Sequence, residues 1–227
     1  MSANSNNVNN ENNKNNTHNL QHFSESTLSM ELKEYSRVNF NSLFNSHPEH
    51  KGKVQVFNKD PNNPKWNEEQ CHRYHKSYLK TPLFNKTVNK SYMFSGENQE
   101  EIEEELPEMF KPFLNFMTEQ DAKYNQVVVN WYENENDYMP SHSDWTDGMV
   151  KGHKISALTL TETDEDKKRS LVVLSKSEGV THTIKLTHGQ ILTMHDGFQE
   201  LYRHEVPVLS LEPNKNRRIS ISFRQFE

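Results

Sequence analysis

The sequence contains a single cysteine, Cys71, among 227 residues, so an internal disulfide is excluded. This is typical of a protein that works in a reducing compartment, and Cys71 is interpreted as a structural thiol. The sequence also lacks an apolar run of membrane-spanning length and the hydrophobic segment of a secretory signal peptide. We therefore expect an intracellular protein of the cytoplasm or nucleus, not a secreted one, with no membrane partner.

Several common catalytic signatures are missing as well. The chain has no phosphate-binding loop, no Ser-His-Asp order and no zinc-type cysteine cluster. An excess of positive charge is also missing, because the net charge is −6, whereas domains that bind nucleic acid by charge are usually basic. Basic residues nevertheless gather at 76–90, 167–169 and 215–218, which leaves room for a local basic groove on an acidic protein.

Asparagine occupies ten of the first twenty positions, with almost no apolar residue between them. Such a tract buries too little surface to offset the entropy lost on ordering. We therefore predict a disordered Asn-rich tail over residues 1–26 and one catalytic domain over residues 27–227.

The second half of the chain has the pattern of many short strands separated by turns, which is typical of an all-β roll. The expected strands are 126–132, 155–160, 171–174, 182–186, 190–194, 202–206 and 217–224. Apolar residues at helical spacing predict a helix within 100–117 that begins near Pro107. Residues 27–44 favour a strand or short helix, and residues 47–90 favour turns and short strands.

His142-Ser143-Asp144 is the most informative motif of the chain. Residues i and i+2 of an extended segment point to one side, so His142 and Asp144 can face one metal while Ser143 faces away. Two imidazoles and one carboxylate form the facial triad that binds non-haem Fe(II) and leaves positions open for a co-substrate and O₂. We expect His204 to be the second imidazole, and His195 is its main rival.

The last expected strand alternates strictly, with Ile219, Ile221 and Phe223 on one face and polar residues on the other. Its two arginines, Arg218 and Arg224, lie about 20 Å apart along a strand, so we do not expect them to share one carboxylate. Arg218 can bind the far carboxylate of 2-oxoglutarate, and Arg224 can lean back toward the metal.

From about Leu79 to its end, the chain resembles the AlkB-like Fe(II)/2-oxoglutarate dioxygenases. Members show an Asn-x-Tyr motif, a His-x-Asp motif, a distal His before a short apolar-Pro stretch, and two arginines six positions apart. The corresponding residues here are Asn130-Trp131-Tyr132, His142-Ser143-Asp144, His204-Glu205-Val206-Pro207, and Arg218 with Arg224. The stretch from Tyr92 to Gly96 looks like the family's Tyr-x-Phe-Ser-Gly motif.

The resemblance implies a mainly β fold with flanking helices (α+β), built on a double-stranded β-helix, or jelly roll. It implies a lid region at about 46–96 and a core at about 124–227. The cofactors that it implies are Fe(II), 2-oxoglutarate as co-substrate, and O₂. The implied roles are metal binding by His142, Asp144 and His204, and 2-oxoglutarate binding by Asn130, Tyr132, Arg218 and Arg224.

The chain departs from the family around the substrate rather than the iron. Trp145 and Thr146 follow the ligand aspartate where many members carry an acidic residue, and Asp147 comes next. Val88-Asn89 replaces an expected Tyr-Gly, and Thr161-Glu162 replaces an expected Leu-Gly. The candidate substrate-binding residues are Tyr92, Phe94, Trp145 and Asp147.

The function that this resemblance implies is oxidative demethylation of N-alkylated bases in DNA or RNA, as in DNA repair, with release of formaldehyde and succinate. We expect a monomer that prefers single strands, with aromatic residues of the lid sandwiching the base and a few cations neutralising phosphates. The expected aromatic residues are Trp66, Tyr78, Tyr92 and Phe94, and the expected cations are Lys86, Lys90, Lys168 and Arg169. Two alternatives stay open: a hydroxylase of a protein side chain or small molecule, and a catalytically silent jelly roll that binds nucleic acid or protein.

Overall fold

The computed structural model describes residues 20, 22–58, 65–79, 93–94, 97–98, 104–120, 123–163, 169–177, 179–209 and 216–227. For 53–58, 65–70, 93–94, 97–98 and 179–181 it describes the backbone only. Tyr92, Lys86, Lys90 and Lys168 therefore lie outside the described residues, as do residues 1–19 of the expected tail.

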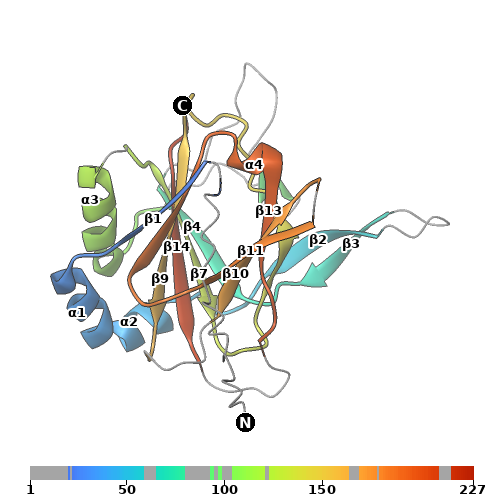
Figure 1. The fold of residues 1–227 in the computed structure, drawn as a ribbon. Helices are drawn as coiled ribbons and strands as arrows, with labels where there is room; N and C mark the ends of the chain where they lie inside the picture. The colour runs from blue at the N-terminus through green and yellow to red at the C-terminus, as the bar shows by residue number, and fades with distance from the viewer. Residues whose placement is uncertain are drawn as a thin grey trace, which may run out of the picture.

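Two antiparallel sheets form the core of the molecule (Figure 1). The larger has the order β1 (Phe23–Thr27), β12 (Gln190–His195), β9 (Lys154–Thr161), β14 (Arg218–Arg224), β7 (Gln126–Tyr132), β4 (Tyr74–Leu79). The smaller has the order β11 (Gly179–Lys185), β10 (Ser170–Ser175), β13 (Tyr202–Val206), β8 (Met139–His142). This confirms the expected jelly-roll class, and β7 and β13 have the bounds that the sequence predicted.

The remaining elements are short and lie outside the two sheets. Two hairpins are formed by β2 (Lys53–Asn58) with β3 (Lys65–Gln70), and by β5 (Met93–Phe94) with β6 (Glu97–Asn98). The helices are α1 (Met30–Val38), α2 (Phe40–Asn45), the 3₁₀ turn η1 (Glu108–Phe110), α3 (Lys111–Gln120) and α4 (Phe198–Leu201). None of the described helices is long and apolar enough to cross a membrane.

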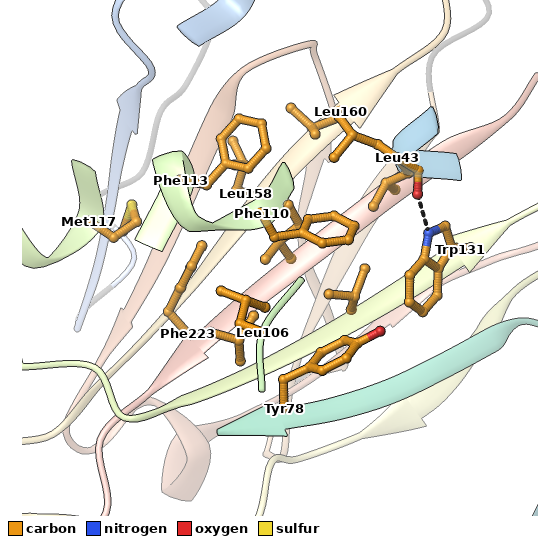
Figure 2. Packing of buried hydrophobic residues seen from close by; sticks show 14 of the residues in the cluster. Leu43, Tyr78, Leu106, Phe110, Phe113, Met117, Trp131, Leu158, Leu160 and Phe223 are labelled. Atoms are coloured by element: carbon orange, nitrogen blue, oxygen red, sulfur yellow. Dashed lines mark hydrogen bonds between the residues drawn. The ribbon is translucent and has the colours of Figure 1, made fainter. Parts of the chain in front are cut away.

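Strand β7 is buried along its whole length and separates two environments. Its Val127, Val129 and Trp131 belong to the hydrophobic cluster that α1, α2 and α3 cover. Trp131 Nε1 donates a hydrogen bond to the Leu43 carbonyl at 2.9 Å, which ties α2 to the sheet (Figure 2). Because successive side chains alternate across a sheet, Asn130 and Tyr132 face the other side, toward the smaller sheet.

A second cluster fills the space between the two sheets. Leu192 and Met194 of the larger sheet pack there with Val173 and Val206 of the smaller sheet and with Phe198 of α4. Strand β14 follows the same division, since Ile219, Ile221 and Phe223 belong to the helix-covered cluster. Its polar residues therefore face the space between the sheets, as the alternation predicted.

Three expectations need correction. The ordered domain begins earlier than residue 27, because Phe23–Thr27 pairs with β12 as an edge strand whose polar sequence hides its role. Residues 27–44 are not one element, since Ser29 caps α1 and a second helix follows. Part of the expected lid, β4, is a member of the main sheet beside β7.

The helix expected within 100–117 is present, and it starts as the prolines predicted. Pro107 precedes the 3₁₀ turn, and α3 begins at Lys111 with Pro112 in its first turn, where a missing backbone N–H costs nothing. Phe110, Phe113 and Met117 carry the apolar stripe into the core (Figure 2).

Candidate metal centre and co-substrate pocket

His142, Asp144 and His204 converge at the β8 edge of the smaller sheet. His142 and His204 are direct cross-strand partners of β8 and β13, and their ring centres lie 4.3 Å apart. Asp144 follows two residues after β8. The candidate ligand atoms of the three residues all lie within 4.8 Å of one another, and no second cluster of this kind occurs among the described residues.

The spacing of these atoms fits a shared metal ion. Nε2 of His142 lies 3.7 Å from Asp144 Oδ1, and Nε2 of His204 lies 3.8 Å from Asp144 Oδ2. These contacts are too long for hydrogen bonds, but two ligand atoms each about 2.1 Å from one ion lie roughly 3–4 Å apart. Two imidazoles and a carboxylate are the donor set of non-haem Fe(II) sites.

The loop around Asp144 is held by hydrogen bonds that orient the candidate ligands. His142 Nδ1 lies 2.8 Å from the Pro140 carbonyl, which can only accept, so Nδ1 carries the proton and Nε2 is free to bind a metal. The Asp144 backbone N–H donates to Gln199 Oε1 at 2.9 Å. Ser143 donates its hydroxyl to the Tyr202 carbonyl at 2.8 Å, so it does face away from the centre.

The electrostatics keep these residues in the protonation states that a metal requires. Burial opposes ionisation of Asp144, but the nearby Arg224 and the two imidazoles outweigh it and hold the carboxyl pKa well below its usual range. Burial, with a further contribution from His142, lowers the pKa of His204 to about 3. At neutral pH the centre therefore holds a carboxylate and a neutral His204, which are the metal-binding forms.

Arg218 and its neighbours form a second buried polar site on the same inner face. β14 pairs with β7 so that Arg218 lies opposite Tyr132 and Ser220 lies opposite Asn130. The Arg218 guanidinium lies 4.0 Å from the centre of the Tyr132 ring. Nε and Nη2 of Arg218 are buried without a hydrogen-bond partner among the described residues. Buried donors of this kind require an acceptor, and a carboxylate matches a guanidinium in shape and charge.

Arg224 lies at the metal end, as the strand pattern predicted. Its Nη2 lies 3.1 Å from Asp144 Oδ1. The rival ligand His195 is not part of the cluster, because its Nε2 bonds with the Ser24 hydroxyl at 2.8 Å between β12 and the edge strand β1. The described structure thus brings together His204 rather than His195 with the His-x-Asp pair.

The candidate substrate-binding residues lie in different environments. Trp145 is half-buried and packs against the cluster between the sheets, and Asp147 is exposed. Phe94 belongs to β5, of which only the backbone is described. Tyr78 cannot stack on a base, since it is 2% exposed and packs in the helix-covered core.

One expected phosphate contact is also wrong. Arg169 is only 4% exposed, and its guanidinium donates to the backbone carbonyls of Asn134, Asp137 and Pro207. The guanidinium therefore fixes two loops to each other and is not available to a phosphate. A basic residue that ends an acidic loop looks exposed in the sequence, and only the tertiary structure shows its burial.

Two residues beside Asn130 were missed. Arg73 donates to Asn130 Oδ1 at 2.8 Å, and His75 is the cross-strand partner of Asn130. His75 lies in β4 and Arg73 directly precedes it, and the polar sequence of β4 gives no sign that it lies beside the buried β7. Its alternation, with Tyr74 and Tyr78 on one face, could have indicated a strand but not its neighbour.

Comparisons with known proteins add a family match and similar structures to these observations. A family model described as the 2OG-Fe(II) oxygenase superfamily matches residues 21–224, whereas no curated protein matches the chain. Among solved structures, OsALKBH1 has a TM-score of 0.50 at 12% identity over 90% of this chain and 98% of that one. An oxidoreductase of the 2OG-Fe(II) oxygenase family from Burkholderia pseudomallei has a TM-score of 0.49 at 11% identity over 90% and 85%.

The structural likenesses are too distant in sequence to show more than a shared fold. The family model, in contrast, spans both sheets, the His-x-Asp pair and the arginine strand. The chain belongs to the 2OG-Fe(II) oxygenase superfamily, and it is an oxidoreductase that depends on Fe(II), 2-oxoglutarate and O₂.

Proposed function

We propose that this oxygenase oxidatively demethylates N-alkylated bases in DNA or RNA and releases formaldehyde and succinate. The proposal rests mainly on one observation: the candidate ligand atoms of His142, Asp144 and His204 lie within 4.8 Å of one another. The other motifs of the chain resemble those of AlkB-like proteins. The likeness in fold to OsALKBH1, a protein named for AlkB, supports this choice of substrate class.

In this proposal His142, Asp144 and His204 hold Fe(II). The chemistry that the bound metal supplies is a coupled oxidation in which O₂ gives one oxygen atom to 2-oxoglutarate, forming succinate and CO₂, and one to a substrate C–H bond. An N-methyl group hydroxylated in this way leaves the base as formaldehyde. The fold adds a metal-side carboxylate, Asp144, which Arg224 keeps ionised and oriented.

Asn130, Tyr132 and Arg218 bind 2-oxoglutarate at the opposite end of the pocket. Their exposed fractions are 5%, 2% and 2%, so a bound carboxylate is shielded from water there. A charge-assisted hydrogen bond is stronger in such a site than in solvent, and a guanidinium can make two of them to one carboxylate. The buried Nε and Nη2 of Arg218 are the donors for that contact.

The base must leave its stack before its methyl group can reach the metal. The loop after Asp144, with Trp145 and Asp147, and the hairpin that carries Phe94 are proposed to contact it, together with Tyr92. A net charge of −6 supports few phosphate contacts, so single strands are proposed to be preferred over duplexes. The protein is proposed to act as a monomer.

The test has two stages. Anaerobic titration of the protein with Fe(II) and then 2-oxoglutarate measures assembly of the site, with His204→Ala as the control that should not assemble it. Formaldehyde release is then measured over a panel of single-stranded methylated DNA and RNA oligonucleotides. Normal assembly without formaldehyde from any oligonucleotide would contradict nucleic-acid demethylation. It would favour the alternative of a protein or small-molecule hydroxylase, to which the acidic net charge is also suited.

A further inference from the structure

Arg73 lies beside the proposed 2-oxoglutarate pocket, although no motif of the chain points to it. It is 3% exposed and directly precedes the edge strand β4. Its Nε donates to Asn130 Oδ1 at 2.8 Å, and its Nη1 donates to Cys71 Sγ at 3.2 Å. These contacts help to fix the guanidinium, and one of them is made with Asn130, a proposed 2-oxoglutarate-binding residue.

The contact with Arg73 determines which end of the Asn130 amide faces the pocket. A guanidinium has five N–H donors and no acceptor, so only the amide oxygen can face it. Nδ2, the donor end, must then point away from Arg73. A carboxylate ligand accepts hydrogen bonds, so the donor end is the one that 2-oxoglutarate can use.

Arg73 also acts electrostatically on Arg218. Arg73, Arg169 and Arg218 are 3%, 4% and 2% exposed, and the guanidiniums of Arg169 and Arg218 lie 5.8 Å and 4.0 Å from the Tyr132 ring centre. Burial lowers the pKa of Arg218, and the nearby charge of Arg73 lowers it further, although Tyr132 opposes both. The acidic neighbours Glu135 and Asp137 act on Arg169.

We propose that Arg73 is a positioning residue of the co-substrate site. It holds the N–H end of the Asn130 amide toward 2-oxoglutarate. The inference rests on the proposed function, in which Asn130 contacts 2-oxoglutarate.

A double-mutant cycle tests whether Arg73 acts through Asn130. The dissociation constant of 2-oxoglutarate is measured anaerobically with the Fe(II)-loaded wild type, Arg73→Met, Asn130→Ala and the double variant. We expect Arg73→Met to weaken 2-oxoglutarate binding about tenfold when Asn130 is present, and less than about threefold when Asn130 is replaced by Ala. Equal losses in both backgrounds would overturn the positioning role.

Arg169→Met is the matched control, because it removes a guanidinium that is equally buried but bonded to backbone carbonyls. We expect it to lower the melting temperature while its effect on 2-oxoglutarate binding is the same with and without Asn130. Coupling of Arg169 to Asn130 as large as that of Arg73 would mean that general packing, not the amide contact, explains the cycle.

Asn130→Asp tests the contact without touching Arg73. The carboxylate still accepts from Arg73 but no longer offers an N–H to the ligand, so we expect an unchanged or higher melting temperature without ligand and much weaker 2-oxoglutarate binding. Binding of 2-oxoglutarate by Asn130→Asp as tight as that of the wild type would sink the inference.

A wild type that does not bind 2-oxoglutarate would contradict the proposed function itself. A wild type that binds it, with Arg73→Met unchanged, would overturn only the role of Arg73.

Discussion

The Arg224 guanidinium lies 3.1 Å from the Asp144 carboxylate, with side-chain exposures of 6% and 11%. The pair joins the arginine strand β14 to the loop after β8, so it links the two sheets at the candidate metal centre. Removing one partner of a buried ion pair leaves the other charge buried and uncompensated, which costs more than the pair itself contributes.

We therefore predict that Arg224→Met weakens metal binding without removing a metal ligand. Loss of the guanidinium raises the pKa of Asp144, so protons compete better for the carboxylate. Mn(II) affinity, measured anaerobically across pH, should fall most steeply at the acid end. Arg217→Met is the control, since Arg217 pairs with Glu162 near the surface. A metal affinity of Arg224→Met equal to that of the wild type at every pH would contradict the assigned role.

The proposed ligands should each be indispensable. His142→Ala, Asp144→Ala and His204→Ala are expected to abolish turnover, because a centre with two ligands holds Fe(II) weakly and in the wrong geometry. His195→Ala should keep turnover, since His195 bonds to Ser24 at the sheet edge. Coupled and uncoupled decarboxylation of 2-oxoglutarate are the measurements. Near-normal decarboxylation by His204→Ala would mean that the distal ligand is another residue.

Arg218→Ala should act on the co-substrate rather than on the prime substrate. Truncating a buried, hydrogen-bonded charge contact costs roughly 2–5 kcal/mol, so the KM for 2-oxoglutarate should rise steeply. The KM for the prime substrate should change little. The decisive comparison is the ratio of the two KM increases. Equal increases would show that Arg218 supports the fold as a whole rather than the far carboxylate.

Much of the catalytic half could be predicted from the sequence because its signals are local. Strict alternation in residues 218–224 predicted both the strand and its polar inner face, and i,i+2 spacing predicted that His142 and Asp144 share a side. The cross-strand pairing of His204 with His142 is not local, so it depended on the family resemblance. Strands in which both faces carry polar and apolar residues gave no such local signal of their orientation.

The errors have a common physical cause, which is polar residues that are buried by tertiary contacts. Arg73 and Arg169 look like surface cations, yet each is buried because its donors find acceptors elsewhere in the fold. Phe23–Thr27 looks like part of a polar tail, yet it forms the edge of the larger sheet through backbone hydrogen bonds. The pattern of side chains in the sequence does not reveal such backbone pairing.

His75 predicts a specific pH dependence of stability. Burial, with the charge of Arg73 beside it, lowers the pKa of His75 to about 4 from its ordinary value of 6.5. Between these values the unfolded chain binds a proton that the folded chain does not, so the free energy of unfolding falls as pH decreases from 6.5 to about 4. The loss from this residue is on the order of 3 kcal/mol.

The measurement is urea unfolding of the wild type and His75→Gln from pH 7.5 to pH 4. The stability advantage of the wild type should be constant above pH 7 and should shrink as the pH falls below the unfolded pKa. His50→Gln, which replaces an exposed histidine, is the control. An advantage that stays constant down to pH 4 would mean that His75 is not held neutral by the fold.

The substrate prediction follows from charge and from the cost of opening a duplex. Formaldehyde should be released faster from a single-stranded methylated oligonucleotide than from the matched duplex, because extruding a paired base adds a few kcal/mol of unstacking. With a net charge of −6 and Arg169 buried, few cations can neutralise phosphates, so binding should weaken only gently as salt rises.

Release rates and dissociation constants on matched strands across a salt series measure both effects. The slope of the logarithm of the binding constant against the logarithm of salt concentration reports how many phosphates are neutralised, at about 0.7 per phosphate for single strands. A shallow slope with faster single-strand turnover is expected from stacking-dominated binding. A steep slope would reveal a basic groove that the net charge conceals. Faster turnover of the duplex would refute the preference for single strands, because the enzyme would then recover the unstacking energy from contacts to the second strand.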